Sequence, residues 1–378
     1  MIVFGATLAV AYVFAYFSRL SPVYSDRAPY YERPDSVGLI FATAALVIVT
    51  GLRCSGGDTV YYWRAFNHLE PGISNLAWFN DGIVFYFFRA VVRTLTDNPQ
   101  IYIFLTALIT YPLFMYVMYH YSEPFEMGVF VFFCSGVLIQ SMNGIRQYMA
   151  SAIIFAGLKL LLENKWKRYI LLILFASLIH ASALVMIPIV FFVRRKAWSM
   201  STFMVLFSGL AVVAIFPSIS PQIAVFLEDT YYERYLEEFS RLDSSGANYI
   251  RALVAAVPVL LAYMGKDKLK EFWPESDIIV NLSIMNFLLM TLSTHLALIA
   301  RVNFYTMPYN CILIPILVSK IFVPKHRKFI YLLVILLYGF YFFYEGYIFY
   351  ISYETLAFGG EMISIGAREG AVILDPWK

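Results

Sequence analysis

The segment "LRCSGGDTVYYWRAFN", residues 52 to 67, places charged and aromatic residues directly after an apolar run. Arg53 lies at the end of that run, and Asp58 follows two glycines that permit a sharp turn. We expect Asp58 to cap a helix over residues 59–69 that carries Arg64 on its polar face. An amphipathic helix in the membrane interface explains this pattern without any function. The functional alternative is that Arg53 and Asp58 point into a shared outer cavity.

A second segment, "NGIRQYMASAIIFAG", places Asn143, Arg146 and Gln147 on the first turn of a predicted helix. Apolar sequence surrounds Arg146, and ionisable groups at membrane depth usually face a cavity and mark a substrate path. Arginine offers a planar fork of donors that grips phosphate or carboxylate in a bidentate manner. A helix start also favours negative charge through its dipole. This pattern predicts an anion site at residues 143–147.

Two more polar positions interrupt apolar sequence. His180 lies between two half-length apolar runs in "LIHASALVMIPIV", which favours a buried turn that faces a pore. A lone histidine in such a run is otherwise more often a structural residue. Arg301 separates two further runs, with His295 before it and Tyr305 after it. A polar junction between adjacent spans would by itself account for Arg301.

Composition restricts the elements that must position these residues. The chain has 378 residues, of which 61% are hydrophobic, 18% aromatic and 14% charged. Repeated apolar runs of roughly 17 to 25 residues are typical of membrane-spanning helices. The net charge of +3 is divided among loops, which gives no basis for a nucleic-acid partner. The three cysteines lack metal-ligand or redox spacing, and the common motifs of soluble enzymes are absent.

The sequence therefore predicts an all-α, polytopic membrane protein with about 10–14 transmembrane helices, including re-entrant or half-length helices. Residues 1–350 form one predicted membrane domain, residues 228–248 an outer amphipathic loop, and residues 351–378 a short tail. The expected helices are 2–18, 37–52, 82–96, 100–120, 127–142, 145–162, 168–193, 202–227, 249–264, 278–299, 302–322 and 329–350.

Orientation follows from the loops that are rich in lysine and arginine, which collect on the cytoplasmic side. The five candidate clusters are Arg19, Arg27 and Arg33; Lys165, Lys167 and Arg168; Arg194, Arg195 and Lys196; Lys266, Lys268 and Lys270; and Lys325, Arg327 and Lys328. Two of these clusters flank residues 168–193, so we expect a helical hairpin there with His180 near its tip. Residues 127–142 are then also re-entrant, about ten full crossings remain, and both termini lie outside.

Three segments taken in order resemble the EpsG-like branch of Wzy-type polysaccharide repeat-unit polymerases. They are "LRCSGGDTVYYWRAFN", "NGIRQYMASAIIFAGLKLLLENKWKRYILLILFASLIHASALVMIPIVFF" and "ARVNFYTMPYNCILIP", and the resemblance covers about residues 37–350. Thr59 follows Asp58 where members of this family often have tyrosine. The resemblance implies a GT-C-like architecture and an inverting glycosyltransferase at the outer leaflet of a bacterial cytoplasmic membrane. Such enzymes join undecaprenyl-diphosphate-linked oligosaccharides onto a growing lipid-linked glycan, without a metal or cofactor.

Within that resemblance, Arg146 and Arg301 are the first candidates for binding the diphosphate, and Arg53 is the next. His180 is the first candidate for the general base, and Asp58 is the second. The expected substrate-binding residues are Gln147, Asn143, Tyr305, His295 and Arg64. The expected partners are the two lipid-linked glycans, membrane lipid and a chain-length regulator protein.

Three alternatives stay open at this point. An O-antigen ligase uses the same donor, but usually carries a larger outer loop. A membrane O-acyltransferase also needs a buried histidine, yet its thioester donor places no diphosphate beside deep arginines. A lipid or polysaccharide transporter predicts inverted repeats with broken helices in corresponding halves, which the sequence does not show.

Overall fold

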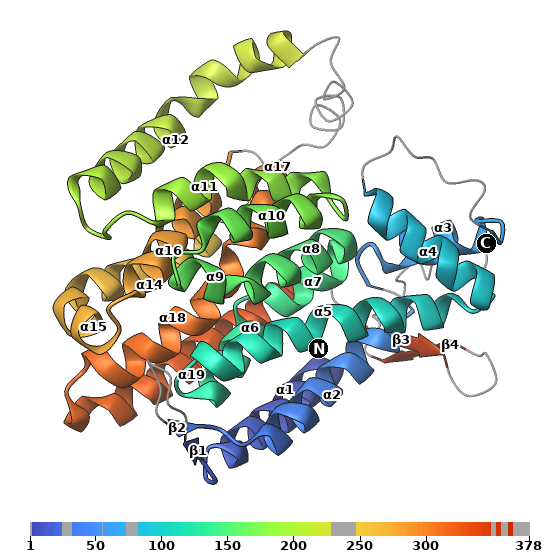
Figure 1. The fold of residues 1–378 in the computed structure, drawn as a ribbon, viewed down its shortest axis with the longest axis horizontal. Helices are drawn as coiled ribbons and strands as arrows, with labels where there is room; N and C mark the ends of the chain where they lie inside the picture. The colour runs from blue at the N-terminus through green and yellow to red at the C-terminus, as the bar shows by residue number, and fades with distance from the viewer. Residues whose placement is uncertain are drawn as a thin grey trace.

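A computed structural model describes residues 2–24, 32–54, 56–72, 82–227, 247–295, 297–348, 353–356 and 362–365. The predicted outer loop 228–248 falls almost wholly outside these residues, as does most of the predicted tail. Within the tail, Tyr353–Leu356 (β3) pairs with Met362–Ile365 (β4) in an antiparallel ribbon. A second small ribbon joins Val23–Tyr24 (β1) to Glu32–Arg33 (β2). The rest of the described chain is helical (Figure 1).

The helices of the first half are α1 (Ile2–Ser18), α2 (Ser36–Gly51), α3 (Thr59–Asn67), α4 (Ile83–Leu95), α5 (Pro99–Tyr121), α6 (Phe125–Cys134), α7 (Val137–Asn143), α8 (Ile145–Ala156) and α9 (Leu158–Leu162). Those of the second half are α10 (Trp166–Ser177), η1 (Ala181–Val185), α11 (Met186–Val193), α12 (Met200–Leu227), α14 (Tyr249–Met264), α15 (Lys266–Phe272), α16 (Ser276–Leu292), α17 (Ala297–Val302), η2 (Asn303–Tyr305), η3 (Met307–Tyr309), α18 (Asn310–Ile316), η4 (Leu317–Ile321) and α19 (Pro324–Ile348).

The predicted hairpin at 168–193 is confirmed in its main feature. Helix α10 ends at Ser177, His180 lies in the turn, and η1 and α11 return along α10 (Figure 1). Two predicted helices, 127–142 and 302–322, are broken where glycine or proline weakens the helical ladder. Gly136, at φ +91°, separates α6 from α7 with a bend of 51°. Residues 302–322 break near Pro308, because proline has no N–H to donate.

The described chain is a multi-pass, all-α membrane protein. Three helices are long and apolar enough to cross a membrane, namely Pro99–Tyr121, Met200–Ile219 and Pro324–Tyr347. Up to six elements qualify if each of three bent helix pairs counts as one span. The prediction of about ten crossings would also need shorter apolar helices such as Ile2–Ser18 to cross, and it stays a prediction.

Helix α5 runs through the middle of the molecule and organises the packing around it (Figure 1). Helices α1 and α2 pack together, α2 packs on α5, and α8 packs on the same helix. Helix α6 is buried along its whole length and contacts α1, α18 and α19. Helix α12 stands apart at the top of the view and exposes apolar residues, as expected for a lipid-facing helix.

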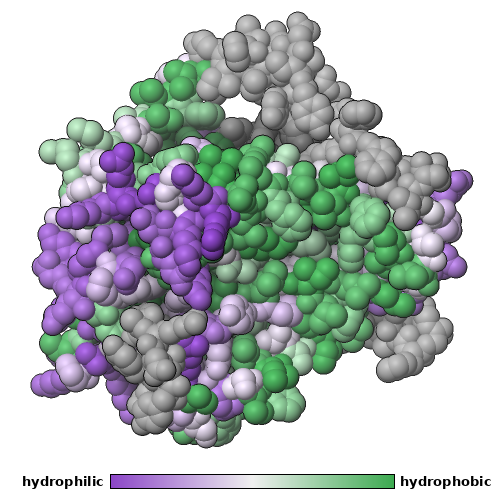
Figure 2. Space-filling model, in the orientation of Figure 1, coloured by the Kyte–Doolittle hydropathy of each residue, from purple (hydrophilic) through white to green (hydrophobic). Residues whose placement is uncertain are grey.

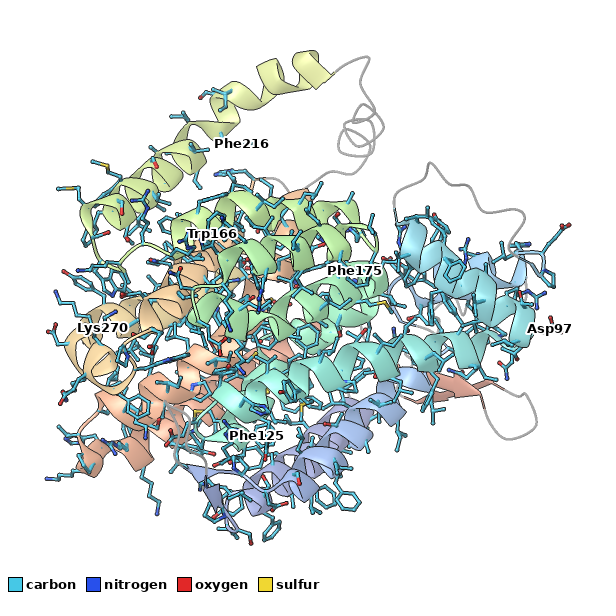
Figure 3. The ribbon with its side chains drawn as sticks, in the orientation of Figure 1. Asp97, Phe125, Trp166, Phe175, Phe216 and Lys270 are labelled. Carbon is cyan, nitrogen blue, oxygen red and sulfur yellow. The ribbon has the colours of Figure 1, made fainter. Side chains whose placement is uncertain are left out.

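Hydrophobic residues cover the middle of the face shown in Figure 2, between hydrophilic residues gathered at the left and a smaller set at the right. Figure 3 labels Lys270 at the left end and Asp97 at the right end. Contacts bring the described basic clusters together at the end of the molecule where Lys270 lies. Arg19 and Arg327 line one cavity there, and Arg33 and Lys159 line another. Lys268 Nζ donates to the carbonyl of Ile321 at 2.9 Å. We refer to this end as the basic end.

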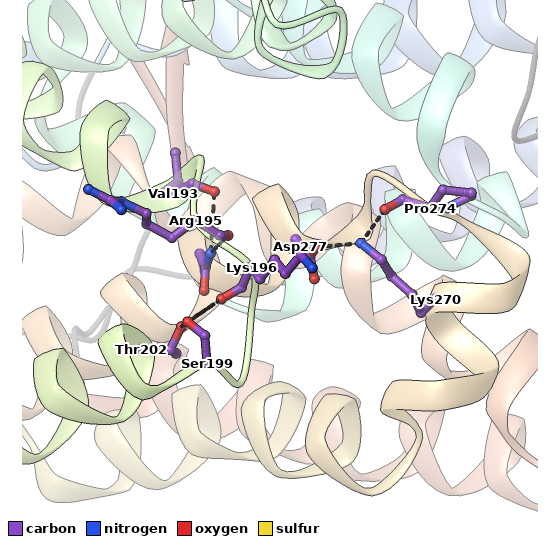
Figure 4. A network of polar contacts seen from close by, with 9 residues as sticks. Val193, Arg195, Lys196, Ser199, Thr202, Lys270, Pro274 and Asp277 are labelled. Carbon is purple, nitrogen blue, oxygen red and sulfur yellow. Dashed lines mark hydrogen bonds and ion pairs between the residues drawn. The ribbon is translucent and has the colours of Figure 1, made fainter.

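Polar contacts at the basic end fix the short turns there (Figure 4). Asn281 Nδ2 donates to the carbonyl of Arg195 at 2.7 Å, which ties α16 to the turn after α11. Thr202 Oγ1 donates to the carbonyl of Lys196 at 3.0 Å. Lys270 forms an ion pair with Asp277 across the α15–α16 turn. The first two bonds give partners to backbone carbonyls of the turn between α11 and α12, and the ion pair holds α15 against the start of α16.

An arginine outside the basic clusters, Arg251, has a structural role. Arg251 of α14 donates from Nε to Glu345 Oε1 at 3.0 Å and from Nη2 to Oε2 at 2.6 Å. The Glu345 side chain is 2% exposed, so the pair is held away from water. The pair ties α14 to α19, and removal of one partner would leave the other as an uncompensated buried charge.

Candidate active site

The connection between α2 and α3 is built around Arg53, which is only 3% exposed. Its Nε donates to Thr59 Oγ1 at 2.9 Å, and its guanidinium also donates to the carbonyl of Thr50. These bonds tie the end of α2 to the start of α3. Arg53 thus supports the connection that carries Asp58.

Asp58 does not cap α3 with its side chain, so this part of the prediction is wrong. Capping residues usually have extended backbone, whereas Asp58 has φ −75° and ψ 1° after Gly56 and Gly57 at positive φ. Its backbone N–H instead donates to Asn143 Oδ1 at 3.1 Å. This bond joins the glycine turn to the end of α7, and it leaves the Asp58 carboxyl directed elsewhere.

The glycine turn tolerates no side chain at position 57. Gly57 has φ +56°, and an added Cβ would collide with the side chain of Asn143. We expect Gly57→Ala to lower the melting temperature and reduce activity, because the turn and its bond to Asn143 must both shift. The matched control is Gly5→Ala in α1, where an added Cβ meets nothing within 4 Å. Thermal unfolding of both variants in detergent checks this prediction, and equal melting temperatures would contradict it.

Asp58 lies outside the candidate spans and close enough to Arg301 for the charge of the guanidinium to act on its carboxyl. Burial raises the pKa of its carboxyl above the ordinary value, and the positive charge of Arg301 opposes part of that rise. Arg301 itself is exposed, at the point where α17 leads into η2. A carboxyl group and a guanidinium from segments more than 240 residues apart therefore lie at the same end of the molecule.

Arg146, on the first turn of α8, lies among aromatic side chains of α3 and α4. Its guanidinium carbon lies 5.7 Å from the centroid of the Tyr86 ring. Burial raises the pKa of Tyr62, and Arg146, which hydrogen-bonds the hydroxyl, opposes that rise. A Cβ on Gly82 would lie 3.0 Å from Arg146 Nη1 and 2.7 Å from the carbonyl oxygen of Ile179. Arg146 and the turn before His180 thus pack on the same glycine.

A hydrogen-bonded hub connects three of the four segments that the sequence singled out. Gln147 Nε2 donates to Ser182 Oγ at 3.0 Å and to the carbonyl of Arg301 at 2.8 Å. Ser182 Oγ also lies 2.7 Å from His180 Nδ1 and 2.9 Å from the Tyr305 hydroxyl. Gln147 is 4% exposed and Tyr305 is 1% exposed, so their geometry is fixed by packing.

Two candidate residues take other positions. His295 stacks on Phe216 of α12, with ring centroids 6.1 Å apart. Arg64 is half-buried in the last turn of α3. The contacts described for these two side chains do not include the hub, and their substrate-binding role stays a prediction.

The site contains residues that sequence reasoning did not select. Ser182 belongs to no motif in the sequence, although a serine two positions after a turn histidine can reach its ring. Gly82 and Tyr62 carry no motif of their own. Only the packing of α3 and α4 against the α7–α8 junction reveals them.

The site and the basic end lie at opposite ends of the same helices. Arg146 starts α8, and Lys159 follows in α9. Helix α10 runs for 12 residues from Lys167 near its start toward His180. At about 1.5 Å per residue, this helix alone separates the two by roughly 18 Å.

Ionisable side chains gathered at one end of a multi-pass helical membrane protein usually face a cavity and mark a substrate path. The EpsG family model matches residues 37–356, and the chain belongs to this family. Membership connects the chain with membrane-bound polysaccharide biosynthesis. Comparisons with curated proteins and with solved structures give no match.

Proposed function

We propose that the chain is a polysaccharide polymerase that joins oligosaccharide repeat units carried on undecaprenyl diphosphate. The observation that carries this proposal is the convergence of Arg146, Arg301, Asp58 and His180 at the end opposite the basic clusters. Such a reaction needs cations for a leaving diphosphate and a base for an acceptor hydroxyl. Both kinds of group are present in the site.

The proposed step is an inverting displacement. The acceptor hydroxyl attacks the anomeric carbon of the donor sugar while the bond from that carbon to the diphosphate oxygen breaks on the opposite face. The acceptor proton passes to the base, and the electron pair of the broken bond leaves with the diphosphate. The growing glycan is thereby transferred onto the next lipid-linked repeat unit.

Arg146 and Arg301 are the proposed ligands of the diphosphate. Each guanidinium is permanently charged and presents several donors in one plane, which suits phosphate oxygens. Arg146 also sits at the start of α8, where the helix dipole favours an anion. Arg53 supports the α2–α3 connection through its bonds to Thr59 and Thr50, so we assign it a positioning role.

The hydrogen bonds of His180 reverse our order of the two base candidates. Its Nδ1 accepts the backbone N–H of Ser182 at 3.3 Å, so in the neutral ring the proton resides on Nε2. His180 can then donate from Nε2 to a substrate oxygen. Asp58, whose pKa is raised by burial, is the better placed proton acceptor in this proposal.

Removing the Ser182 hydroxyl tests the hub. We expect Ser182→Ala to lower the polymerisation rate about tenfold, because Gln147 and Tyr305 each lose a partner and the His180 ring is less firmly held. The control is Ser177→Ala in α10, whose hydroxyl donates within its own helix to the carbonyl of Leu174. Initial rates of glycan extension compare the two variants, and an equal effect of both would refute the role of the hub.

We further propose that the site faces the outside of a bacterial cytoplasmic membrane. The support is the position of the basic clusters, since loops rich in lysine and arginine collect on the cytoplasmic side. The site at the other end of α8 and α10 then opens outward. Lipid-linked repeat units would be joined at that outer surface.

The decisive experiment is reconstitution of the purified protein with lipid-linked repeat units in liposomes. A ladder of longer lipid-linked glycans is the expected product. Transfer only when lipid A core is added would instead identify a ligase. Acyl transfer from a thioester would identify an acyltransferase, and movement of substrate across the bilayer without a new bond would identify a transporter.

A further inference from the structure

One of the cavities at the basic end lies between the end of α1 and the start of α19 and has a volume of about 430 Å³. Its cationic lining consists of Arg19, Lys320, Arg327 and Lys328. Tyr12 of α1 and Tyr331 of α19 line it as well, and their hydroxyls lie 2.6 Å apart. The cavity therefore joins two helices that are distant in sequence, and it is separate from the candidate active site.

The charges around this cavity do not cancel. Arg19 Nη1 pairs with the buried Glu126 at 2.8 Å, and Lys320 pairs with Glu123 at 2.6 Å. Within the part of the chain that the structure describes, Arg327 and Lys328 have no acidic residue at ion-pair distance. Arg327 Nε instead donates to the carbonyl of Phe322 at 2.9 Å. The described lining thus keeps two positive charges in excess.

Helix α19, which supplies these two residues, makes the excess positive charge more unfavourable. Arg327 and Lys328 stand at the beginning of α19, where the helix dipole already favours negative charge. The first turn of α19 contains no acidic residue. Cations at the positive end of a 25-residue helix are locally unfavourable, and a bound anion would remove that conflict.

The surroundings of the cavity point to a lipid as the source of the anion. On α1, Val13 and Phe17 are exposed, and on α19, Leu332 and Leu336 are exposed. Val13 and Phe17 follow the lining residues Tyr12 and Tyr16 directly in sequence, and Leu332 and Leu336 continue from the cavity toward the middle of α19, where acyl chains could lie. Tyrosines beside basic residues are typical of the level of lipid headgroups in a membrane.

We propose that this cavity binds the phosphate of an anionic phospholipid headgroup, with the acyl chains lying along α1 and α19. Arg327 and Lys328 provide the uncompensated charge, while the Arg19–Glu126 and Lys320–Glu123 pairs form its walls. The site is a lipid-binding site apart from the reaction site, so it does not depend on the proposed glycosyl transfer. Basic pockets between membrane helices on the cytoplasmic side commonly hold such headgroups.

The test measures binding of dioleoyl phosphatidylglycerol to the delipidated full-length protein in neutral detergent, with dioleoyl phosphatidylcholine as the comparison lipid. Wild type should prefer phosphatidylglycerol, and Arg327→Gln with Lys328→Gln should weaken that binding about 30-fold. The control is Lys325→Gln with Arg195→Gln, which removes the same charge from exposed residues at the basic end that do not line the cavity. Glycerol 3-phosphate is added as a soluble competitor.

Equal losses in the two double variants would overturn the proposal, because they would show a diffuse charge effect. Displacement of the lipid by glycerol 3-phosphate at similar concentration would overturn it too, since the cavity would then hold a free phosphate compound. Thermal unfolding establishes that each variant is folded. Should the variant at 327 and 328 fail to fold, equal affinity of wild type for the two lipids would still refute the proposal.

Discussion

Replacing Arg146 by alanine, and separately Arg301 by alanine, is expected to lower the polymerisation rate roughly a hundredfold or more in each case. Removal of one preorganised donor to a developing anion has effects of about this size in other enzymes. Arg146 packs against Tyr62 and Gly82, and the exposed Arg301 lies close enough to Asp58 for its charge to act on that carboxyl. Because the leaving diphosphate gains charge as the bond breaks, the loss should fall mainly on kcat.

The matched control for these variants is Arg195→Ala, an exposed arginine at the basic end. We expect that variant to retain the wild-type rate. Lysine at either active-site position should restore only part of the rate, because one ammonium cannot reproduce the planar fork of a guanidinium. Full activity of both alanine variants would exclude these arginines as ligands of the diphosphate.

Substitution of Asp58 by asparagine is expected to reduce kcat by roughly 10²–10⁴, the range typical of general base removal. Asparagine has a similar shape, and the bond from the backbone N–H of Asp58 to Asn143 Oδ1 does not need the carboxyl. The variant should therefore fold normally. Measured melting temperatures separate this chemical effect from a loss of structure.

The pH profile gives the same prediction a second test. The base must be ionised, and burial raises the pKa of Asp58 above about 3.9, the ordinary value for aspartate. As the pH is lowered, activity should therefore be lost at a pH above about 3.9, where the carboxyl becomes protonated. The asparagine variant should lack this acidic limb. Asp97→Asn is the control, because Asp97 is an exposed aspartate at the α4–α5 turn whose ion pair among the described residues is with Arg93. An unchanged profile in the asparagine variant at position 58 would assign the base elsewhere.

The sequence predicted the helices well where long apolar runs end in polar residues. Helices 2–18 and 249–264 agree with α1 and α14 at both ends. The turn at His180 could also be predicted, because basic residues flank both ends of the hairpin and leave the histidine in its middle. These features depend on local composition and on the cost of burying charge in lipid.

The remaining features depend on contacts between distant segments. Nothing near Asp58 in the sequence shows that its backbone meets Asn143, 85 residues away. Arg53 follows an apolar run as a substrate ligand would, and only the fold shows that it bonds Thr59 and Thr50. Similarly, the Ser182 N–H donates to His180 Nδ1, and this bond sets which ring nitrogen carries the proton. No sequence pattern specifies that position.

Binding of polyprenyl diphosphate tests the central claim most directly, since it isolates the role of the two arginines from the rest of the reaction. The affinity of the purified protein for this product is compared with its affinity for polyprenyl monophosphate. Wild type and Arg195→Ala should prefer the diphosphate, and the double variant Arg146→Ala with Arg301→Ala should lose that preference. An undiminished preference in a folded double variant would contradict the assignment of the diphosphate to this end of the molecule.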